Sequence, residues 1–331
     1  MLSFKPRPPY TLTLLTTMRC NASCEECCFG CRPESKATMS LDQMKRYIDI
    51  CREAYPETMR ILSLTGGECM LLGEDLVKVI EYAYNKGMAT TMVTNGFWGK
   101  SYRKTYQFLK RLKSIGLFDI AVSTGERNQK IETYESCRNI MVAAARLGIG
   151  TEMRISNHWG HTSYTKLIDK DKALLRLINS KKVKVVWWEW DDDFSNENIG
   201  NRSYPWRIRP TEEDKPCTSL YHSIILTPFG DVMACCGIPC ARIPYMRLGN
   251  IDEEVGIKGV YERGFADALK IWIHTKGPCA ILKYVYDNTD IRFRHASGSR
   301  CMMCLEIFTN PKILPFLKES YFDWRKSIPV L

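Results

Sequence analysis

The 331-residue chain has no apolar run that approaches the roughly 20 residues needed to span a bilayer. Its first residues, Met1-Leu2-Ser3-Phe4-Lys5-Pro6, lack the continuous apolar core of a secretory signal peptide. The chain also lacks internal repeats and low-complexity tracts. We therefore expect a globular, cytoplasmic protein with no membrane partner.

The formal net charge is +10, but the sequence has no basic module interleaved with aromatic residues of the kind that binds RNA. Lysine and arginine are spread through most segments, in short clusters such as Arg103-Lys104. A solvated basic surface therefore accounts for the charge better than nucleic-acid binding does, and we expect no nucleic-acid partner. An acidic peptide substrate is compatible with this charge.

Cysteine is abundant, with 15 residues, and in a cytoplasmic chain this indicates metal or redox chemistry in place of a disulfide framework. Three of them, Cys20, Cys24 and Cys27, form a C-x₃-C-x₂-C pattern directly after the apolar run from Tyr10 to Met18. Three thiolates can hold a cubane iron–sulfur cluster and leave one iron without a protein ligand. That open iron can bind a substrate or a cofactor.

A second register of the same pattern, Cys24, Cys28 and Cys31, also fits the sequence. We favour the first register because it follows the first predicted strand directly. A zinc site is the alternative, since thiolates at these spacings bind zinc too.

The first 190 residues alternate short apolar runs with helical patterns, which is typical of βα units around a parallel sheet. Six such units predict an α/β fold, a partial (β/α)6 TIM-type barrel with its site at the carboxyl ends of the strands. The predicted strands are Thr11–Thr17, Arg60–Leu64, Ala89–Thr94, Asp119–Ser123, Gly150–Ile155 and Val183–Trp190. The predicted helices are Ser40–Ala54, Leu72–Lys86, Ser101–Ser114, Ile131–Leu147 and Tyr164–Asn179.

The polar residues 191–216 are predicted to link the barrel, residues 1–190, to a small C-terminal α+β iron–sulfur domain, residues 217–331. That domain begins with a β-hairpin, Ser223–Pro228 and Val232–Cys235, which turns at Phe229-Gly230-Asp231. A helical segment over residues 254–274 follows. Cys301-Met302-Met303-Cys304 is predicted to lie in a loop before a C-terminal helix.

Two local patterns support the barrel. Ser40, with Gln43 three residues on, resembles a capping box at the start of the first helix. Thr65-Gly66-Gly67-Glu68 follows the second predicted strand, where two glycines allow backbone to approach a ligand closely and Glu68 can accept a hydrogen bond from an ammonium. A plain strand-to-helix turn is the alternative interpretation of Gly66 and Gly67.

Three further strand ends carry polar residues: Asn95, Ser123 and Arg154. Because carboxyl ends of parallel strands meet at one edge of a barrel, we expect these side chains to lie near the cysteine loop. Simple capping of the strand ends is the alternative for each.

A second set of cysteines lies near the C-terminus. Cys217 and Cys235 flank Gly230 in a C-x₁₂-G-x₄-C pattern, and Cys301 and Cys304 add a C-x₂-C pair. Together they offer four thiolates, enough for one fully ligated [4Fe–4S] cluster. A structural zinc knot is the alternative.

The C-x₃-C-x₂-C pattern with the Gly-Gly-Glu motif resembles the radical SAM superfamily. The resemblance implies that S-adenosylmethionine fills the open iron site of a [4Fe–4S] cluster held by Cys20, Cys24 and Cys27. It also implies that Gly66, Gly67 and Glu68 contact the methionyl amine, and that Asn95, Ser123 and Arg154 meet the ribose and carboxylate. The C-x₁₂-G-x₄-C hairpin resembles SPASM and twitch domains, which implies one auxiliary [4Fe–4S] cluster.

Further motifs resemble the radical SAM peptide epimerases of the epipeptide type. They are Arg19-Cys20-Asn21-Ala22-Ser23-Cys24, Cys27-Cys28-Phe29-x-Cys31, Asn95-Gly96-Phe97-Trp98-Gly99 and Cys235-Cys236. Cys236 follows Cys235 on a predicted strand, so its side chain points the opposite way. The resemblance assigns Cys236 the role of hydrogen donor.

The resemblance thus implies removal of a Cα hydrogen from an L-residue by a 5′-deoxyadenosyl radical, with hydrogen returned from Cys236 to give a D-residue. The implied partners are a ribosomally made precursor peptide and a low-potential electron donor of the flavodoxin or ferredoxin type. Because the first strand begins near residue 10, we expect no N-terminal leader-binding domain.

Three other functions stay open. The first is radical cross-linking of a peptide through a thioether or C–C bond, which needs no hydrogen donor such as Cys236. The second is a radical dehydrogenase acting on a small molecule. The third is an electron-transfer or zinc-binding module without catalysis.

Overall fold

The computed structural model describes residues 7–24, 27–125, 133–157, 163–189, 204–205, 207–211, 213–235, 237, 243–295 and 299–328. The chain divides into two compact units. One comprises Thr11–Ser195 with Thr227–Phe229, and the other comprises Met1–Tyr10, Asn196–Leu226 and Gly230–Leu331. The sequence-based boundaries at residues 190 and 216 stay a prediction.

The first unit is built on parallel strands in the order β6-β5-β4-β3-β2-β1, so each strand pairs with its predecessor in the chain. This sequential order confirms the predicted partial barrel of six βα units. The strands are β1 (Thr11–Thr17), β2 (Ile61–Gly66), β3 (Ala89–Thr94), β4 (Leu117–Gly125), β5 (Gly150–Asn157) and β6 (Lys184–Glu189).

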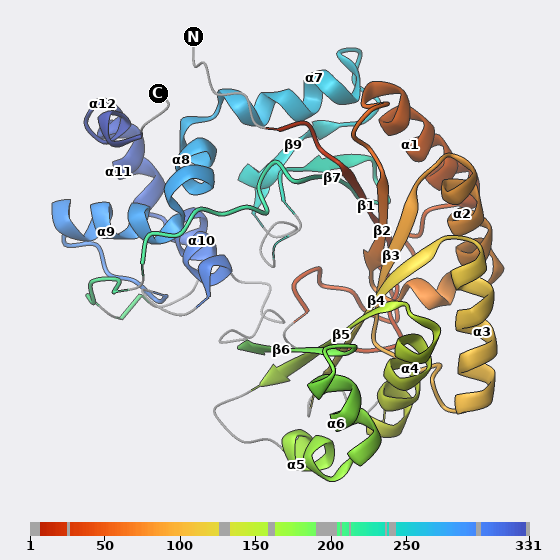
Figure 1. Cartoon of the computed structure of the whole chain (residues 1–331). Coiled ribbons are helices and arrows are strands. Elements are labelled where there is room, and N and C mark those ends of the chain that lie inside the picture. The colour runs from red at the N-terminus through yellow and green to blue at the C-terminus, as the bar shows by residue number, and fades with distance from the viewer. Residues whose placement is uncertain are drawn as a thin grey trace. The chain divides into compact units, whose positions relative to one another are not determined.

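The helices of this unit connect successive strands, and Figure 1 shows α1 to α4 on the outer side of the curved sheet. They are α1 (Leu41–Ala54), η1 (Cys69–Leu72), α2 (Glu74–Asn85), α3 (Tyr102–Ser114), α4 (Tyr134–Leu147), α5 (Ser163–Lys170) and α6 (Lys172–Asn179). The predicted single helix Tyr164–Asn179 is wrong. Asp171 divides it, because its carboxylate accepts from the backbone N–H groups of Ala173 and Leu174 at 3.1 and 3.0 Å and so caps α6.

The cap of α1 follows the prediction in part. Ser40 Oγ accepts from the backbone N–H of Gln43 at 3.1 Å, as expected of an N-cap. The Gln43 side chain donates to Tyr47 Oη at 2.8 Å and does not accept from the backbone N–H of Ser40. The serine cap is confirmed, and the reciprocal half of the capping box is absent between these two described residues.

Alternation along the strands separates two faces of the sheet. Leu62, Leu64 and Ile120 are fully buried on the face that packs against the helices. Residues on the opposite face, such as Ser63 and Thr91, are polar and only partly buried. The concave side of the partial barrel is therefore a polar, partly solvated surface on which a polar cofactor can be bound.

The second unit contains a small antiparallel sheet of β7 (Ser223–Leu226), β8 (Asp231–Met233) and β9 (Arg247–Asn250). The predicted hairpin is confirmed as β7–β8, but β8 ends at Met233, so Cys235 lies outside the strand that was predicted to include it. Gly230 adopts φ +80°, so the turn requires a residue without a Cβ.

Helices make up most of the rest of this unit. They are η5 (Pro244–Met246), α7 (Gly256–Glu262), η6 (Arg263–Ala266), α8 (Ala268–Lys276), α9 (Pro278–Asn288), α10 (Arg300–Thr309), α11 (Ile313–Glu319), α12 (Tyr321–Trp324) and η7 (Arg325–Ser327). The core includes Trp272 stacked on Trp324, with ring centroids 4.9 Å apart. Throughout the described part of the chain, no helix has both the length and the apolar character required to cross a bilayer.

The prediction that Cys301–Cys304 lies in a loop is wrong, because both cysteines are in the first turns of α10. Met302, Met303 and Leu305 are buried and anchor this helix in the core. A C-x₂-C pair on a helix still presents both thiols on one face, since residues three apart are neighbours along the surface.

Candidate functional site

The cysteine loop that follows β1 is closed at its base by backbone hydrogen bonds. Cys20 N donates to Arg32 O, and Arg32 N donates to Met18 O, each at 3.2 Å. The Arg32 guanidinium also donates through Nη1 to the carbonyl oxygens of Cys24 and Cys31 at 3.0 and 2.9 Å. Arg32 therefore fixes the loop around two of its cysteines.

Cys27 lies in a pocket of donors within this loop. The Cys31 thiol donates to it, and the backbone N–H of Cys31 lies 3.3 Å from Cys27 Sγ. The thiol hydrogen bond from Cys31, with the N–H groups of Cys31 and Phe29 and the charge of Arg32, lowers the pKa of Cys27 to about 6 against the effect of burial. Cys27 and Cys31 are thus joined by a hydrogen bond within the loop, and the choice between the two registers stays a prediction.

Cys20 lies in an environment that disfavours its thiolate. Burial raises the pKa of its thiol to about 11, although Ala22 N donates to Cys20 Sγ at 3.4 Å. Glu68 and Cys27 are near enough for their negative charges to raise this pKa further. Cys20 and Cys27 therefore share one electrostatic environment, and iron binding at Cys20 would have to displace a proton.

The Gly-Gly-Glu motif packs directly on the backbone that leads into the cysteine loop. Gly67 N donates to Thr17 O at 2.6 Å, and Glu68 N donates to Arg19 O at 3.0 Å. A Cβ on Gly67 would lie 2.0 Å from Arg19 O. The close approach that requires glycine here is to the residue before Cys20, an interaction the sequence analysis did not anticipate.

We expect Gly67→Ala to destabilise the protein by at least about 3 kcal/mol, because the added methyl group meets backbone that cannot move aside. The matched control is Gly148→Ala, at φ +68° in the same unit, where the nearest neighbour of a Cβ is the flexible tip of Lys113 at 3.4 Å. That variant should lose only about 1–2 kcal/mol through its left-handed backbone. Chemical denaturation of both proteins measures the difference, and equal losses would contradict the packing argument.

Glu68 is fully buried and joins the ends of two strands. Its Oε1 accepts from Met70 N at 3.0 Å and Thr94 Oγ1 at 2.8 Å, while Oε2 accepts from Asn95 N at 2.7 Å. Burial raises the pKa of Glu68 to about 7 despite these donors. Since a carboxylate offers about four acceptor positions, Oε2 can accept one more hydrogen bond.

The strand-end residues lie at one edge, as predicted. Thr94 pairs with Val122, which places Asn95 level with Ser123, and Ser123 pairs with Arg154 across β4 and β5. Ser123 and Arg154 are both partly buried. Arg154 Nε donates to Glu152 Oε1 at 2.6 Å, so this guanidinium is paired with a carboxylate on its own strand.

The second unit brings together the thiols predicted to hold an auxiliary cluster. Burial raises the pKa of Cys304, and the neighbouring thiols of Cys235, Cys301 and Cys217 raise it further. Each of the other three therefore lies within electrostatic range of Cys304. Cys236, the predicted hydrogen donor, lies outside the described residues.

The backbone around Cys217 is fixed by the C-terminal end of α8. Cys217 N donates to Ile273 O at 3.1 Å, and the ring of His274 contacts Cys217 O through Nδ1 at 3.2 Å. The side chain of Arg300 donates to Pro216 O at 2.8 Å and so joins this segment to the start of α10. These contacts hold distant parts of the sequence together around Cys217.

Neither cysteine group has the compact geometry of a zinc site. Within the described ranges, no three Cys, His, Asp or Glu side chains are grouped so that they could hold a single metal ion. Zinc requires Zn–S distances of about 2.3 Å. The two donor sets consist of thiols, three in the first unit and four in the second, which is the donor chemistry that iron–sulfur clusters use.

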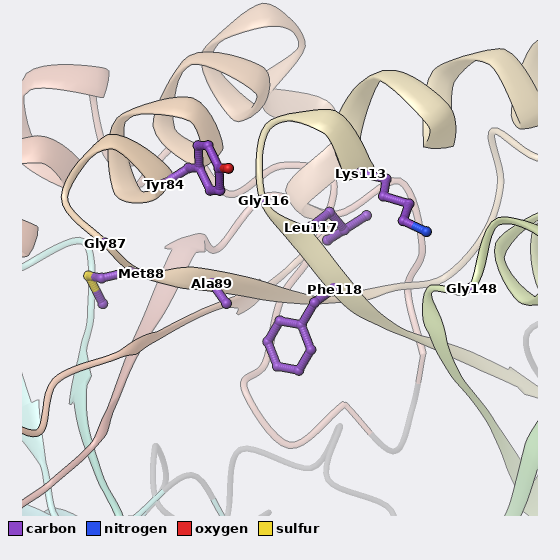
Figure 2. Close-up of a pocket in the computed structure, with 9 residues that line it drawn as sticks. All are labelled: Tyr84, Gly87, Met88, Ala89, Lys113, Gly116, Leu117, Phe118 and Gly148. Atoms are coloured by element: carbon purple, nitrogen blue, oxygen red, sulfur yellow. The ribbon is translucent and has the colours of Figure 1, made fainter.

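A pocket of about 460 Å³ lies elsewhere in the first unit and is shown in Figure 2. It is lined by Tyr84, Ala89, Leu117 and Phe118, among others, at the amino ends of β3 and β4. Asn95 and Ser123 are at the opposite ends of these strands. The pocket contains no cysteine or carboxylate and does not belong to the candidate site.

Two residues of the site were missed by sequence reasoning. Thr94 donates to Glu68, and Arg32 supports the cysteine loop. No sequence signal could have found these contacts, because they depend on tertiary structure. Asn21 and Cys31 are part of motifs recognised in the sequence, but their hydrogen bonds to Asn95 and Cys27 were not predicted.

Comparison with known proteins finds similarity to one family model, to curated relatives and to solved structures. Residues 11–140 match the model of the 4Fe-4S single cluster domain. Over 131 residues the chain is 28% identical to the putative peptide biosynthesis protein YydG of Bacillus subtilis (strain 168). This matched region covers 40% of each chain. It is 22% identical over 298 residues to the antilisterial bacteriocin subtilosin biosynthesis protein AlbA of the same organism, covering 80% of this chain and 61% of AlbA.

The matched part of the chain thus spans less than two thirds of either relative's length. Among solved structures, native anSMEcpe with bound AdoMet superimposes with a TM-score of 0.54 at 12% identity, over 97% of this chain and 100% of that one. That likeness shows a common fold. The cluster-domain match covers the C-x₃-C-x₂-C and Gly-Gly-Glu motifs, and it supports the expected [4Fe–4S] cluster and the resemblance of these motifs to those of radical SAM proteins.

Proposed function

We propose that the protein modifies a ribosomally made peptide, and that the modification converts L-residues to D-residues. The names of the two curated relatives, a peptide biosynthesis protein and a bacteriocin biosynthesis protein, support a peptide substrate. The observation that carries epimerisation is the sequence pair Cys235-Cys236, in which a second cysteine directly follows a member of the four-thiol group around Cys304.

The first cluster is assigned to Cys20, Cys24 and Cys27, with Arg32 holding the loop and Cys31 donating to Cys27. The auxiliary cluster is assigned to Cys217, Cys235, Cys301 and Cys304. When bound, the first cluster and S-adenosylmethionine supply a 5′-deoxyadenosyl radical that removes a hydrogen atom from the substrate.

The residues assigned to S-adenosylmethionine are Gly66, Gly67, Glu68, Asn95, Ser123 and Arg154. Glu68 suits an ammonium group because Oε2 keeps one acceptor position in a site where its carboxylate is fully buried. A cation at that position would lower the pKa of Glu68 from about 7 and keep it ionised. The partly buried polar face at Ser123 and Arg154 would take the ribose and the carboxylate.

Cys236 is assigned the return of hydrogen to the planar Cα. Its S–H bond breaks, a Cα–H bond forms, and a thiyl remains. One electron from a low-potential flavodoxin- or ferredoxin-type donor, with a proton, restores the thiol. The protein determines which Cα is reached and from which side the hydrogen returns, while the cofactor supplies the radical.

The test is an anaerobic incubation of the enzyme with S-adenosylmethionine, reductant and a candidate peptide encoded beside its gene, in deuterated water. Epimerisation should raise the peptide mass by one deuterium in place of hydrogen for each modified residue, with the deuterium on Cα. A mass loss of two hydrogens without deuterium would instead indicate cross-linking or dehydrogenation and would remove the role of Cys236.

A further inference from the structure

The side-chain amide of Asn95 extends from the end of β3 to the cysteine loop. Its Nδ2 lies 2.7 Å from Asn21 Oδ1 and 3.9 Å from Cys20 Sγ. An amide nitrogen carries two hydrogens, and each therefore has an acceptor in the loop. The end of the third strand is in this way connected to the first cysteine.

The orientation of this amide is determined by its other contacts. Asn95 Oδ1 accepts from Phe97 N at 3.1 Å, so the oxygen must face its own backbone and the nitrogen must face the loop. The backbone N–H of Asn95 donates to Glu68 Oε2 at 2.7 Å, which holds the residue against the Gly-Gly-Glu motif. Because Glu68 is fully buried, this anchor is shielded from water.

Asn21 determines which hydrogen of the Asn95 amide is available to Cys20. Asn21 Oδ1 accepts one of the two amide hydrogens, and the other is directed to Cys20 Sγ. The backbone N–H of Ala22 is a second donor to the same sulfur, at 3.4 Å. Cys20 Sγ is therefore approached by one donor from its own loop and one from a strand far away in sequence.

Hydrogen bonds to the sulfurs of an iron–sulfur cluster help to set its reduction potential. Reduction adds negative charge, and a donor directed at a ligand sulfur stabilises the more negative state. We infer that Asn95 is a positioning residue that donates an N–H···S hydrogen bond to Cys20 and so raises the reduction potential of the first cluster. This inference rests on the proposed assignment of Cys20 as an iron ligand, and it is a different role from contact with S-adenosylmethionine.

The test uses the reconstituted holoenzyme and measures the midpoint potential of the first cluster by redox titration monitored by electron paramagnetic resonance. The first cluster is recognised because its signal changes when S-adenosylmethionine is added. In Asn95→Ala, the equilibrium constant for reduction should fall at least fivefold, a shift of about 40 mV to more negative potential at 59 mV per tenfold change. The matched control is Asn85→Ala at the end of α2, an exposed asparagine outside the candidate site, whose variant should keep the wild-type potential.

A second variant keeps the inference testable if Asn95→Ala holds too little iron. Asn95→Asp keeps an acceptor for Phe97 N but replaces the donor with a negative charge, so its potential should fall further than that of Asn95→Ala. A wild-type potential in either variant at full iron content would overturn the inference. Weaker binding of S-adenosylmethionine with an unchanged potential would overturn it too, and would make Asn95 a cofactor ligand only. If Cys20 is not an iron ligand, Cys20→Ala should retain the first cluster. This result distinguishes failure of the ligand assignment from failure of the inference about Asn95.

Discussion

Cys20→Ala is expected to lose about half of the iron of the reconstituted protein and all cleavage of S-adenosylmethionine. Two [4Fe–4S] clusters contain about eight irons, and the variant should keep the roughly four of the auxiliary cluster. With one of its three thiolates removed, the first cluster would lack the ligands to stay bound. Iron analysis and quantification of 5′-deoxyadenosine measure the two effects.

The matched control for this prediction is Cys31→Ala. Cys31 is buried and donates to Cys27, so its loss should leave the iron content near eight atoms and change only the surroundings of Cys27. The opposite pattern, with iron lost from Cys31→Ala and kept by Cys20→Ala, would establish the second register of Cys24, Cys28 and Cys31.

Cys304→Ala completes the comparison. It should also lose about four irons, but the remaining cluster should still respond to S-adenosylmethionine. A variant that keeps all its iron would show that Cys304 ligates no auxiliary cluster. Because Cys304 is buried, the fold of this variant is checked first by circular dichroism.

The sequence was sufficient to predict the barrel because its strands are short apolar runs separated by helical periodicity. Thr11–Thr17 and Ala89–Thr94 match β1 and β3 end to end. Periodicity does not reveal a break such as Asp171, where two consecutive amphipathic helices continue the same pattern and only the cap of α6 marks the division. Cys301–Cys304 was misplaced because a pair of cysteines at this spacing suits a metal-binding loop and one face of a helix equally well.

The candidate site, like the fold, could be predicted from the sequence only in part. Its motif residues were predictable because the strand ends of a parallel barrel meet at one edge, and Asn95, Ser123 and Arg154 lie there in register. What Gly67 contacts was not predictable, because the clash of its Cβ with Arg19 O depends on how β2 is aligned with β1. The hydrogen bond between Asn95 and Asn21 likewise joins residues 74 positions apart and requires the tertiary structure.

The second large effect is expected from Cys236→Ala. If Cys236 returns hydrogen to Cα, this variant should still form 5′-deoxyadenosine with the peptide present, because abstraction precedes the step in which the thiol acts. The yield of D-residue should fall below a tenth of the wild-type value, since no donor of comparable position replaces the thiol. Chiral amino-acid analysis of the hydrolysed peptide, with quantification of 5′-deoxyadenosine, measures both quantities in one reaction.

The matched control is Cys240→Ala, four residues further along the chain, which should epimerise as the wild type does. A full yield of D-residue from Cys236→Ala would remove its assigned role. Loss of 5′-deoxyadenosine as well would mean that the residue supports cofactor or substrate binding and not hydrogen return. If Cys236→Ala still abstracts hydrogen but forms no epimer, the enzyme is an epimerase. A cross-linking enzyme needs no hydrogen donor and would make its product without Cys236. The two reactions differ in whether a hydrogen atom comes back, and this one side chain tests that difference.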